Sequence, residues 1–126
     1  MRGVEECYHG SQVRVFRLNR QEVLSRLRLS AERLLAERSD VLAVWLFGSL
    51  ARNDAAPGSD ADLLIAVRDG AGPFLDRPVS LTGYFTGAGV GCDVIAYTES
   101  EVERLRQDST SFVGTALAEG TCLARR

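Results

Sequence analysis

The chain has 126 residues and a net charge of −2, a length typical of one domain and a charge that excludes a strongly basic, nucleic-acid-binding protein. Its apolar runs are too short to predict a membrane span, and its N-terminus lacks the apolar stretch of a signal peptide. Three widely spaced cysteines and a single histidine argue against a disulfide framework or a zinc site. The sequence therefore predicts one cytoplasmic domain over residues 1–126, in which residues 1–18 form a poorly patterned N-terminal extension.

A helix is predicted over about residues 20–38. Asn19 followed by Glu22 is a helix-start pattern, because the Asn side chain can accept a hydrogen bond from the backbone three residues later. Apolar residues then recur at helical spacing, and charged residues occupy the remaining positions. The pattern indicates an amphipathic helix with one face on the core.

Three strands are predicted from continuous apolar runs. The runs are residues 41–47 (VLAVWLF), 61–67 (ADLLIAV) and 92–97 (CDVIAY). Their short length and their β-branched and aromatic residues favour buried strands. A short helix over residues 49–53 is expected to follow the first run, with Ser49 as its N-cap.

The remaining stretches are less regular. Residues 69–78 contain two glycines and two prolines and are predicted to form a loop. Residues 79–91 fit either a short helix with a glycine-rich turn or a strand with a hairpin. A capping box over residues 98–101 opens a helix to about residue 107, and a last helix is predicted over residues 111–119. This order of elements indicates an α/β (α+β) fold with a small central sheet flanked by helices.

Two carboxylates at the start of the second strand, Asp60 and Asp62, form a candidate metal site. Side chains alternate along a strand, so both point to the same side, about 6–7 Å apart along the chain. A divalent cation would relieve their repulsion, and carboxylate, phosphate and water oxygens are the ligands that Mg²⁺ prefers. The alternative is that Asp60 caps a turn and Asp62 is an exposed acid, because the D-x-D pattern is common by itself.

Gly48 and Ser49 lie where the first strand turns into a helix. A glycine allows close backbone approach there, and free N–H groups at a helix start attract phosphate. A phosphate cradle next to an acid pair is the equipment of phosphoryl or nucleotidyl transfer. Asp93 is the candidate third acid because it also opens a buried strand, where it could share a metal and take the proton of an attacking hydroxyl. Its alternative role is a plain strand-edge acid.

The thiol of Cys92 should face the core, because it alternates with Asp93 along the third strand. Three aromatic residues are candidates for stacking an adenine, although packing in the core is the commoner role of such side chains. They are Tyr84, Phe85 and Tyr97.

The segments FGSLAR, SDADLLIAV and CDVIAY resemble the minimal nucleotidyltransferases of the DNA polymerase β-like nucleotidyltransferase superfamily. The resemblance covers residues 23–123 and implies the nucleotidyltransferase fold, with a small mixed central sheet and a last helix and strand in ALAEGTCL. The chain departs from the family pattern at Asn53, where a glycine is usual. The glycine-rich stretch before Asp93 is also longer than the family pattern.

The resemblance also implies roles for individual residues. Gly48 and Ser49 would hold the β- and γ-phosphates of a nucleotide. Arg52 matches the arginine of the family's GSxAR pattern and would either contact phosphate or pack the short helix. Three carboxylates would bind two Mg²⁺ ions, with the third of them also serving as the base. They are Asp60, Asp62 and Asp93.

Short members of this family resemble antitoxins that are paired with a HEPN-domain RNase toxin. With a complete acid set, the resemblance implies an enzyme that transfers AMP from ATP to a tyrosine of the toxin. One alternative is a non-enzymatic antitoxin that neutralises its partner by binding. The other is a nucleotidyltransferase for a small molecule, with the acceptor pocket supplied by another subunit. No direct contact with nucleic acid or membrane is expected, and homo- and hetero-oligomers both remain open.

Overall fold

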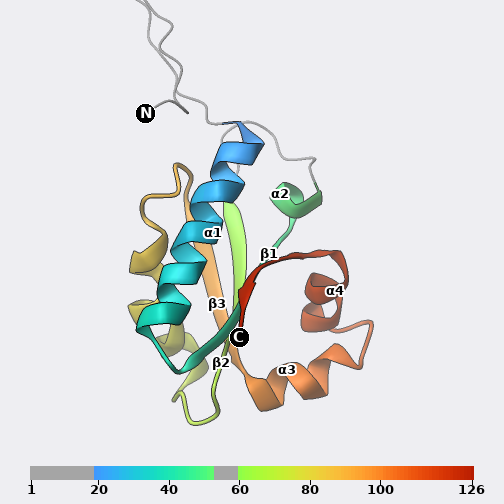
Figure 1. Ribbon diagram of the computed structural model, residues 1–126. Coiled ribbons are helices and arrows are strands. Elements are labelled where there is room, and N and C mark those ends of the chain that lie inside the picture. The colour runs from blue at the N-terminus through green and yellow to red at the C-terminus, as the bar shows by residue number, and fades with distance from the viewer. Residues whose placement is uncertain (1–18, 53–59) are drawn as a thin grey trace, which may run out of the picture.

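A four-stranded sheet forms the centre of the protein in a computed structural model that describes residues 19–52 and 60–126 (Figure 1). The predicted N-terminal extension and Asn53 lie outside the described residues. The strand order is β3-β2-β1-β4. The strands are β1 (Val41–Phe47), β2 (Ala61–Val67), β3 (Cys92–Thr98) and β4 (Thr121–Arg125).

The sheet is mixed. Strand β1 is antiparallel to both of its neighbours, β2 and β4, whereas β2 and β3 run parallel. The three strands predicted from apolar runs are confirmed within one residue of their bounds. The fourth strand is short and half exposed, so its own pattern did not predict it. The last strand that the family resemblance implied in ALAEGTCL is confirmed as β4. The predicted α/β fold with a small mixed sheet flanked by helices is therefore confirmed.

Helices cover both faces of the sheet (Figure 1). The long helix α1 (Arg20–Glu37) packs its buried side chains against one face, and α3 (Glu99–Arg106) and α4 (Phe112–Glu119) pack against the other. Alternation along the strands divides the core accordingly, so that Leu63 and Ile65 face α1 while Leu64 faces α3 and α4. None of the helices in residues 19–52 and 60–126 combines the length and the apolar character needed to cross a bilayer.

The expected loop over residues 69–78 is partly wrong, because two 3-10 helices follow β2. They are η1 (Phe74–Ser80) and η2 (Thr82–Phe85), and the helix-and-turn alternative for residues 79–91 therefore holds. Tertiary contacts decide this, since Arg77 of η1 donates to the Ala96 carbonyl at 3.2 Å and to Glu101 at 2.7 Å. Local glycine and proline content carries no information about such distant partners.

Two helix starts also differ from expectation. The prediction of Ser49 as an N-cap is wrong, because helix α2 (Ser49–Arg52) already includes Ser49. The residue before the helix is Gly48, whose carbonyl accepts from the Arg52 N–H at 3.1 Å. The φ of Gly48 is +78°, a left-handed conformation that lets the chain leave β1 abruptly and that favours glycine. Helix α4 begins at Phe112, and Ser111 is its N-cap, accepting from the Gly114 N–H at 2.9 Å.

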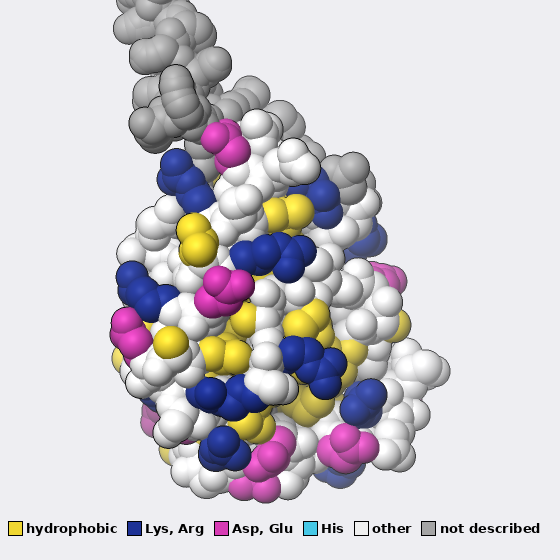
Figure 2. Space-filling model, in the orientation of Figure 1, with side chains coloured by type: hydrophobic (Ala, Val, Ile, Leu, Met, Phe, Trp, Pro, Cys, Tyr) yellow, Lys and Arg dark blue, Asp and Glu magenta, His cyan; other side chains and the backbone are white. Residues whose placement is uncertain are grey.

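Basic side chains are scattered over the face that carries α1. Figure 2 shows them interspersed with acidic and apolar side chains on this face instead of gathered in one basic patch. Two arginines are used for internal contacts: Arg126 donates to the Val41 carbonyl at 2.8 Å, and Arg38 pairs with Asp40 at 2.8 Å. The charges of Arg126 and Arg38 therefore support the fold.

Candidate active site

Three aspartates lie together at one end of the sheet, which we call the acidic end (Asp60, Asp62 and Asp93). Asp62 of β2 is paired with Asp93 of β3 in the parallel register, and Asp60 directly precedes β2. Asp62 is half-buried, and the other two are exposed. Because Leu64 and Ile95, two residues further along these strands, pack with α3 and α4, Asp62 and Asp93 lie on that same face.

The turn between β1 and α2 reaches the acidic end because β1 is antiparallel to β2. The last residue of β1, Phe47, is paired with Asp62, so Gly48 follows directly beside the acid. A Cβ built on Gly48 would collide with Oδ2 of Asp62. The absence of a side chain at Gly48 therefore leaves the space in which this carboxylate lies, and the structure places the Gly48 turn beside the acids.

A second glycine, which sequence reasoning did not single out, has the same relation to Asp60. A Cβ on Gly91 would lie 2.7 Å from Oδ1 of Asp60. The Gly91 carbonyl also accepts a hydrogen bond from the Ala61 N–H at 2.8 Å, which ties the start of β2 to the start of β3. In the sequence, the only indication of this contact was the position of Gly91, two residues before Asp93.

The acidic end is electrostatically strained. Burial raises the pKa of Asp62 above its ordinary value, the negative charges of Asp93 and Asp60 raise it further, and Arg52 opposes the shift. Burial, with smaller contributions from the same two carboxylates, also raises the pKa of the Cys92 thiol to about 11. Cys92 packs against the α1 side of the core, as predicted, and holds a protonated thiol at neutral pH.

The donors at the acidic end are all carboxylate oxygens, which suit a hard divalent cation such as Mg²⁺. A cation there would remove the repulsion that, after burial, contributes to the raised pKa of Asp62. Within residues 19–52 and 60–126, however, no three Asp, Glu, His or Cys side chains are already gathered closely enough to hold a metal ion. Metal binding would therefore require the carboxylates to turn toward a common point.

Helix α2 is held beside the acidic end by contacts from two other helices. Arg20 of α1 donates to the carbonyls of Leu50 at 2.9 Å and Ala51 at 3.3 Å. Arg52 forms an ion pair with Glu119 at the end of α4, with 3.6 Å between Nη1 and Oε1. Arg20 and Glu119 carry no sequence signal, because each acts through a partner that is distant in the chain.

The aromatic residues considered from the sequence do not lie at the acidic end. Phe85 is buried in the core, and the Tyr84 hydroxyl donates to Glu37 of α1 at 2.8 Å. Tyr97 is in tilted contact with Phe74, with 5.1 Å between ring centroids, toward the opposite end of β3. These side chains therefore support the fold.

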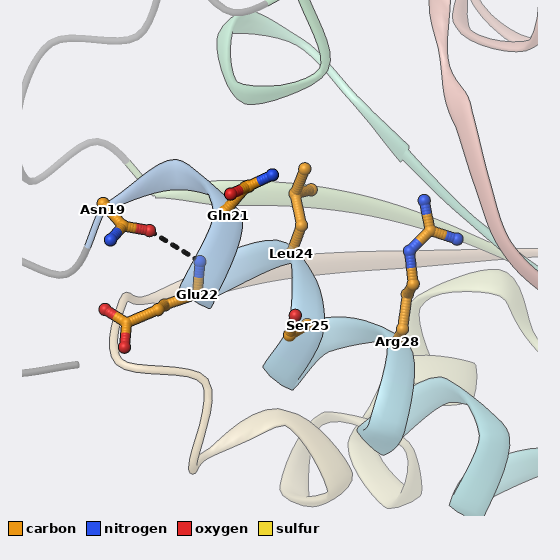
Figure 3. Close-up of a pocket in the computed structure, with 6 residues that line it drawn as sticks. All are labelled: Asn19, Gln21, Glu22, Leu24, Ser25 and Arg28. Atoms are coloured by element: carbon orange, nitrogen blue, oxygen red, sulfur yellow. Dashed lines mark hydrogen bonds between the residues drawn. The ribbon is translucent and has the colours of Figure 1, made fainter. Parts of the chain in front are cut away.

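A separate surface pocket of about 540 Å³ lies at the start of α1 (Figure 3). Its lining includes Leu24, Ser25 and Arg28, and the Asn19 side chain at its rim accepts from the Glu22 N–H at 2.8 Å as predicted. None of the three aspartates lines it. The pocket is thus distinct from the acidic end.

A family model described as "Nucleotidyltransferase domain" matches residues 27–118, which contain the three aspartates and the Gly48 turn. A search among curated proteins returned no significant match.

Solved structures with the same fold include three relatives. A candidate nucleotidyltransferase from Sulfolobus solfataricus is 20% identical with a TM-score of 0.63, covering 85% of this chain and 84% of its own. A candidate minimal nucleotidyltransferase is 29% identical with a TM-score of 0.52, and the match covers 78% of this chain and 93% of that one. A chain from a toxin–antitoxin structure with AMP-PNP is 14% identical with a TM-score of 0.51, and the match covers 86% of this chain and 75% of that one. At 20% and 14% identity, the first and third relatives show similarity of fold alone.

Proposed function

The chain belongs to the nucleotidyltransferase domain family, and from this membership we propose that it transfers AMP from ATP to a hydroxyl group with Mg²⁺ bound at the acidic end. The observation that carries the proposal is the pairing of Asp62 with Asp93 directly beside the Gly48 turn. An acid cluster of this kind next to a turn that can accept phosphate suits in-line transfer at phosphorus.

In the proposed reaction, the acceptor oxygen attacks the α-phosphorus of ATP. The bond from the α-phosphorus to the oxygen bridging to the β-phosphate breaks, and pyrophosphate leaves. Asp93 accepts the proton of the acceptor hydroxyl, and its exposure at the acidic end gives an acceptor access to it. Gly48 and Ser49 hold the β- and γ-phosphates, and Arg52, at the end of the helix that Ser49 begins, makes a further phosphate contact. Asp60, Asp62 and Asp93 would hold two Mg²⁺ ions, which would supply positive charge to the phosphate oxygens.

We propose that the acceptor is a tyrosine of a HEPN-domain RNase toxin and that the chain acts as its antitoxin. Two observations support this choice. The motifs resemble those of minimal nucleotidyltransferases, and the fold is similar to that of a chain from a toxin–antitoxin structure with AMP-PNP. ATP as donor and the free thiols of Cys92 and Cys122 fit a cytoplasmic location.

The experiment is incubation of the full chain with Mg²⁺, ATP labelled on the α-phosphate and the protein encoded by the neighbouring gene. We expect label on the partner, located by mass spectrometry as AMP on tyrosine, and silenced RNase activity. ATP labelled on the γ-phosphate should give no label, which separates AMP transfer from phosphate transfer. An Asp60→Ala/Asp62→Ala variant that transfers AMP undiminished would refute the assignment of the acidic end, and transfer only to a small molecule would refute the antitoxin role.

Neutralisation by binding alone is a second candidate, because no ready-made group of three metal ligands occurs among the described residues. In that case the acidic end binds a nucleotide or no ligand, and its negative charges are not needed to neutralise the partner. The double aspartate variant would then neutralise the partner as potently as the wild type. Loss of neutralisation by a variant that still binds the partner would instead support enzymatic silencing.

A further inference from the structure

An exposed aromatic ring lies at the acidic end. Phe112, the first residue of α4, is in T-shaped contact with Phe47, with 5.2 Å between ring centroids and 82° between ring planes. Phe47 is in turn the residue of β1 that is paired with Asp62. Because directly paired residues project to the same face of a sheet, Phe47 and Asp62 share the face on which α4 lies. Phe112 is therefore a near neighbour of the acidic end.

Phe112 is accessible to solvent although it lies beside a core cluster. Phe112 is 49% exposed, whereas Val113 next to it in the same helix is 1% exposed. Exposing an aromatic ring to water forfeits the favourable burial that normally fixes its place. An accessible π-surface next to the carboxylates is thus available to a planar ligand.

The turn that presents Phe112 is held firmly. The Ser111 hydroxyl donates to the Leu105 carbonyl at 2.7 Å and accepts from the Gly114 N–H at 2.9 Å. A Cβ on Gly114 would collide with the Asp108 carbonyl oxygen, so this turn and α4 are packed without spare room. Because the backbone of this turn is fixed and the ring contacts Phe47, Phe112 loses less freedom when a ligand stacks on it, which favours binding.

We infer that Phe112 is the surface on which the base of the bound nucleotide stacks. The inference rests on the proposed nucleotide site and extends it to the part of the ligand that the phosphate and metal contacts leave unexplained. Stacking on an aromatic side chain is tolerant of the identity of the base, because every base has a π-face. Phe112 therefore contributes affinity for a nucleoside triphosphate over inorganic polyphosphate, whichever base the enzyme uses.

The test compares two ligands by calorimetry in Mg²⁺: a non-transferable ATP analogue with a methylene group between the α- and β-phosphorus atoms, and inorganic tripolyphosphate. We expect Phe112→Ala to weaken binding of the analogue about tenfold, within the range for one base–aromatic stack. Binding of tripolyphosphate should stay within about twofold, because it has no base. Phe112→Tyr keeps the ring and should retain most of the affinity for the analogue.

Phe74→Ala is the matched control, because Phe74 is also a partly exposed phenylalanine in an aromatic pair but contacts Tyr97 away from the acidic end. It should leave both affinities unchanged. Unchanged affinity of Phe112→Ala for the analogue would overturn the stacking role while leaving the nucleotide site intact. Equal losses for both ligands would overturn it too, because Phe112 would then act through the phosphate site. A wild type that binds neither ligand would overturn the proposed function itself.

Discussion

Asp62 lies directly beside Asp93 across the parallel β2–β3 ladder, although two 3-10 helices and a glycine-rich turn separate these residues in the chain. The pairing places two negative charges on one face of the sheet with a third, Asp60, at the start of β2. Like charges paired across strands destabilise a sheet. The acidic end is therefore a place where the fold gives up stability, as functional sites commonly do.

Asp62→Asn should stabilise the protein at neutral pH. Burial, followed by the charges of Asp93 and Asp60, raises the pKa of Asp62 in the folded state, so ionisation disfavours folding. The penalty is absent below the ordinary value of 3.8 and develops as the pH rises through the raised pKa. At pH 7 we expect a gain of about 0.2–1 kcal/mol in the free energy of unfolding by denaturant titration, as for a cross-strand like-charge pair. The gain should shrink as the pH falls toward 3.8.

Glu32→Gln is the control for Asp62→Asn, because it removes one charge from an exposed position on α1. The free energy of unfolding of Glu32→Gln should match that of the wild type both at pH 7 and near pH 3.8. A loss of stability in Asp62→Asn at pH 7 would contradict the explanation that burial and neighbouring negative charges penalise the ionised Asp62 side chain. AMP transfer should disappear in Asp62→Asn despite the gain in stability.

Gly48→Ala should damage both stability and the site. The φ of +78° costs a residue with a Cβ about 1–2 kcal/mol, and the new Cβ would collide with the Asp62 carboxylate. We expect lower stability and loss of nucleotide binding, measured by denaturant titration and calorimetry.

Gly70→Ala separates the two effects of the Gly48 substitution. Gly70 has a φ of +91°, but nothing lies within 4 Å of its Cβ position. Its substitution should lower stability by a similar amount and leave nucleotide binding intact. Equal binding by both variants would show that displacement of Asp62 is unimportant.

Arg77→Ala should destabilise the packing of η1 on β3. The Arg77 side chain is 9% exposed and contacts Glu101 at 2.7 Å, the Gly72 carbonyl at 2.9 Å and the Ala96 carbonyl at 3.2 Å. Removing it takes the Arg77 hydrogen bonds away from these acceptors, which should cost about 1.5–3 kcal/mol in denaturant titration. Arg106→Ala removes an exposed 3.5 Å pair with Glu103 and should cost less than about 1 kcal/mol.

The contact between Arg77 and Glu101 predicts that the free energy of unfolding depends on pH. The hydrogen bond from Arg77, aided by that from the Thr98 N–H, lowers the pKa of Glu101 below its ordinary value of 4.5. The stabilisation from this lowered pKa is therefore fully present above pH 4.5 and is lost as the pH falls through the folded-state pKa. The stability difference between wild type and Arg77→Ala should narrow over that acidic range. A difference that stays constant there would contradict the ion pair.

Cys92 should resist alkylation in the folded protein. Raising the pKa of its thiol from 9.0 to about 11 lowers the thiolate fraction about 100-fold at pH 8. Iodoacetamide labelling followed by peptide mass spectrometry should show slow modification of Cys92 in buffer and normal modification in guanidinium. Equal rates in the two conditions would show that the thiol is exposed.

The sequence predicted the parts of the fold whose signals are local. Continuous apolar runs located β1, β2 and β3, and the Asn19 and Thr98 patterns located helix starts, because these depend on residues only a few positions apart. The 3-10 helix η1 was predicted as part of a loop, because the Arg77 contacts that hold it reach residues far along the chain. For η2, a short helix was one of two open alternatives.

For the candidate site, the sequence by itself determined which acids begin strands and where a glycine turn follows an apolar run. Only the tertiary structure decided that these segments meet, because the register of β2 with β3 and the antiparallel return of β1 are set by packing on α1 and α4. The same packing brought Gly91, Glu119 and Phe112 to the acidic end. Such neighbours depend on the whole core, and no short pattern in the chain encodes them.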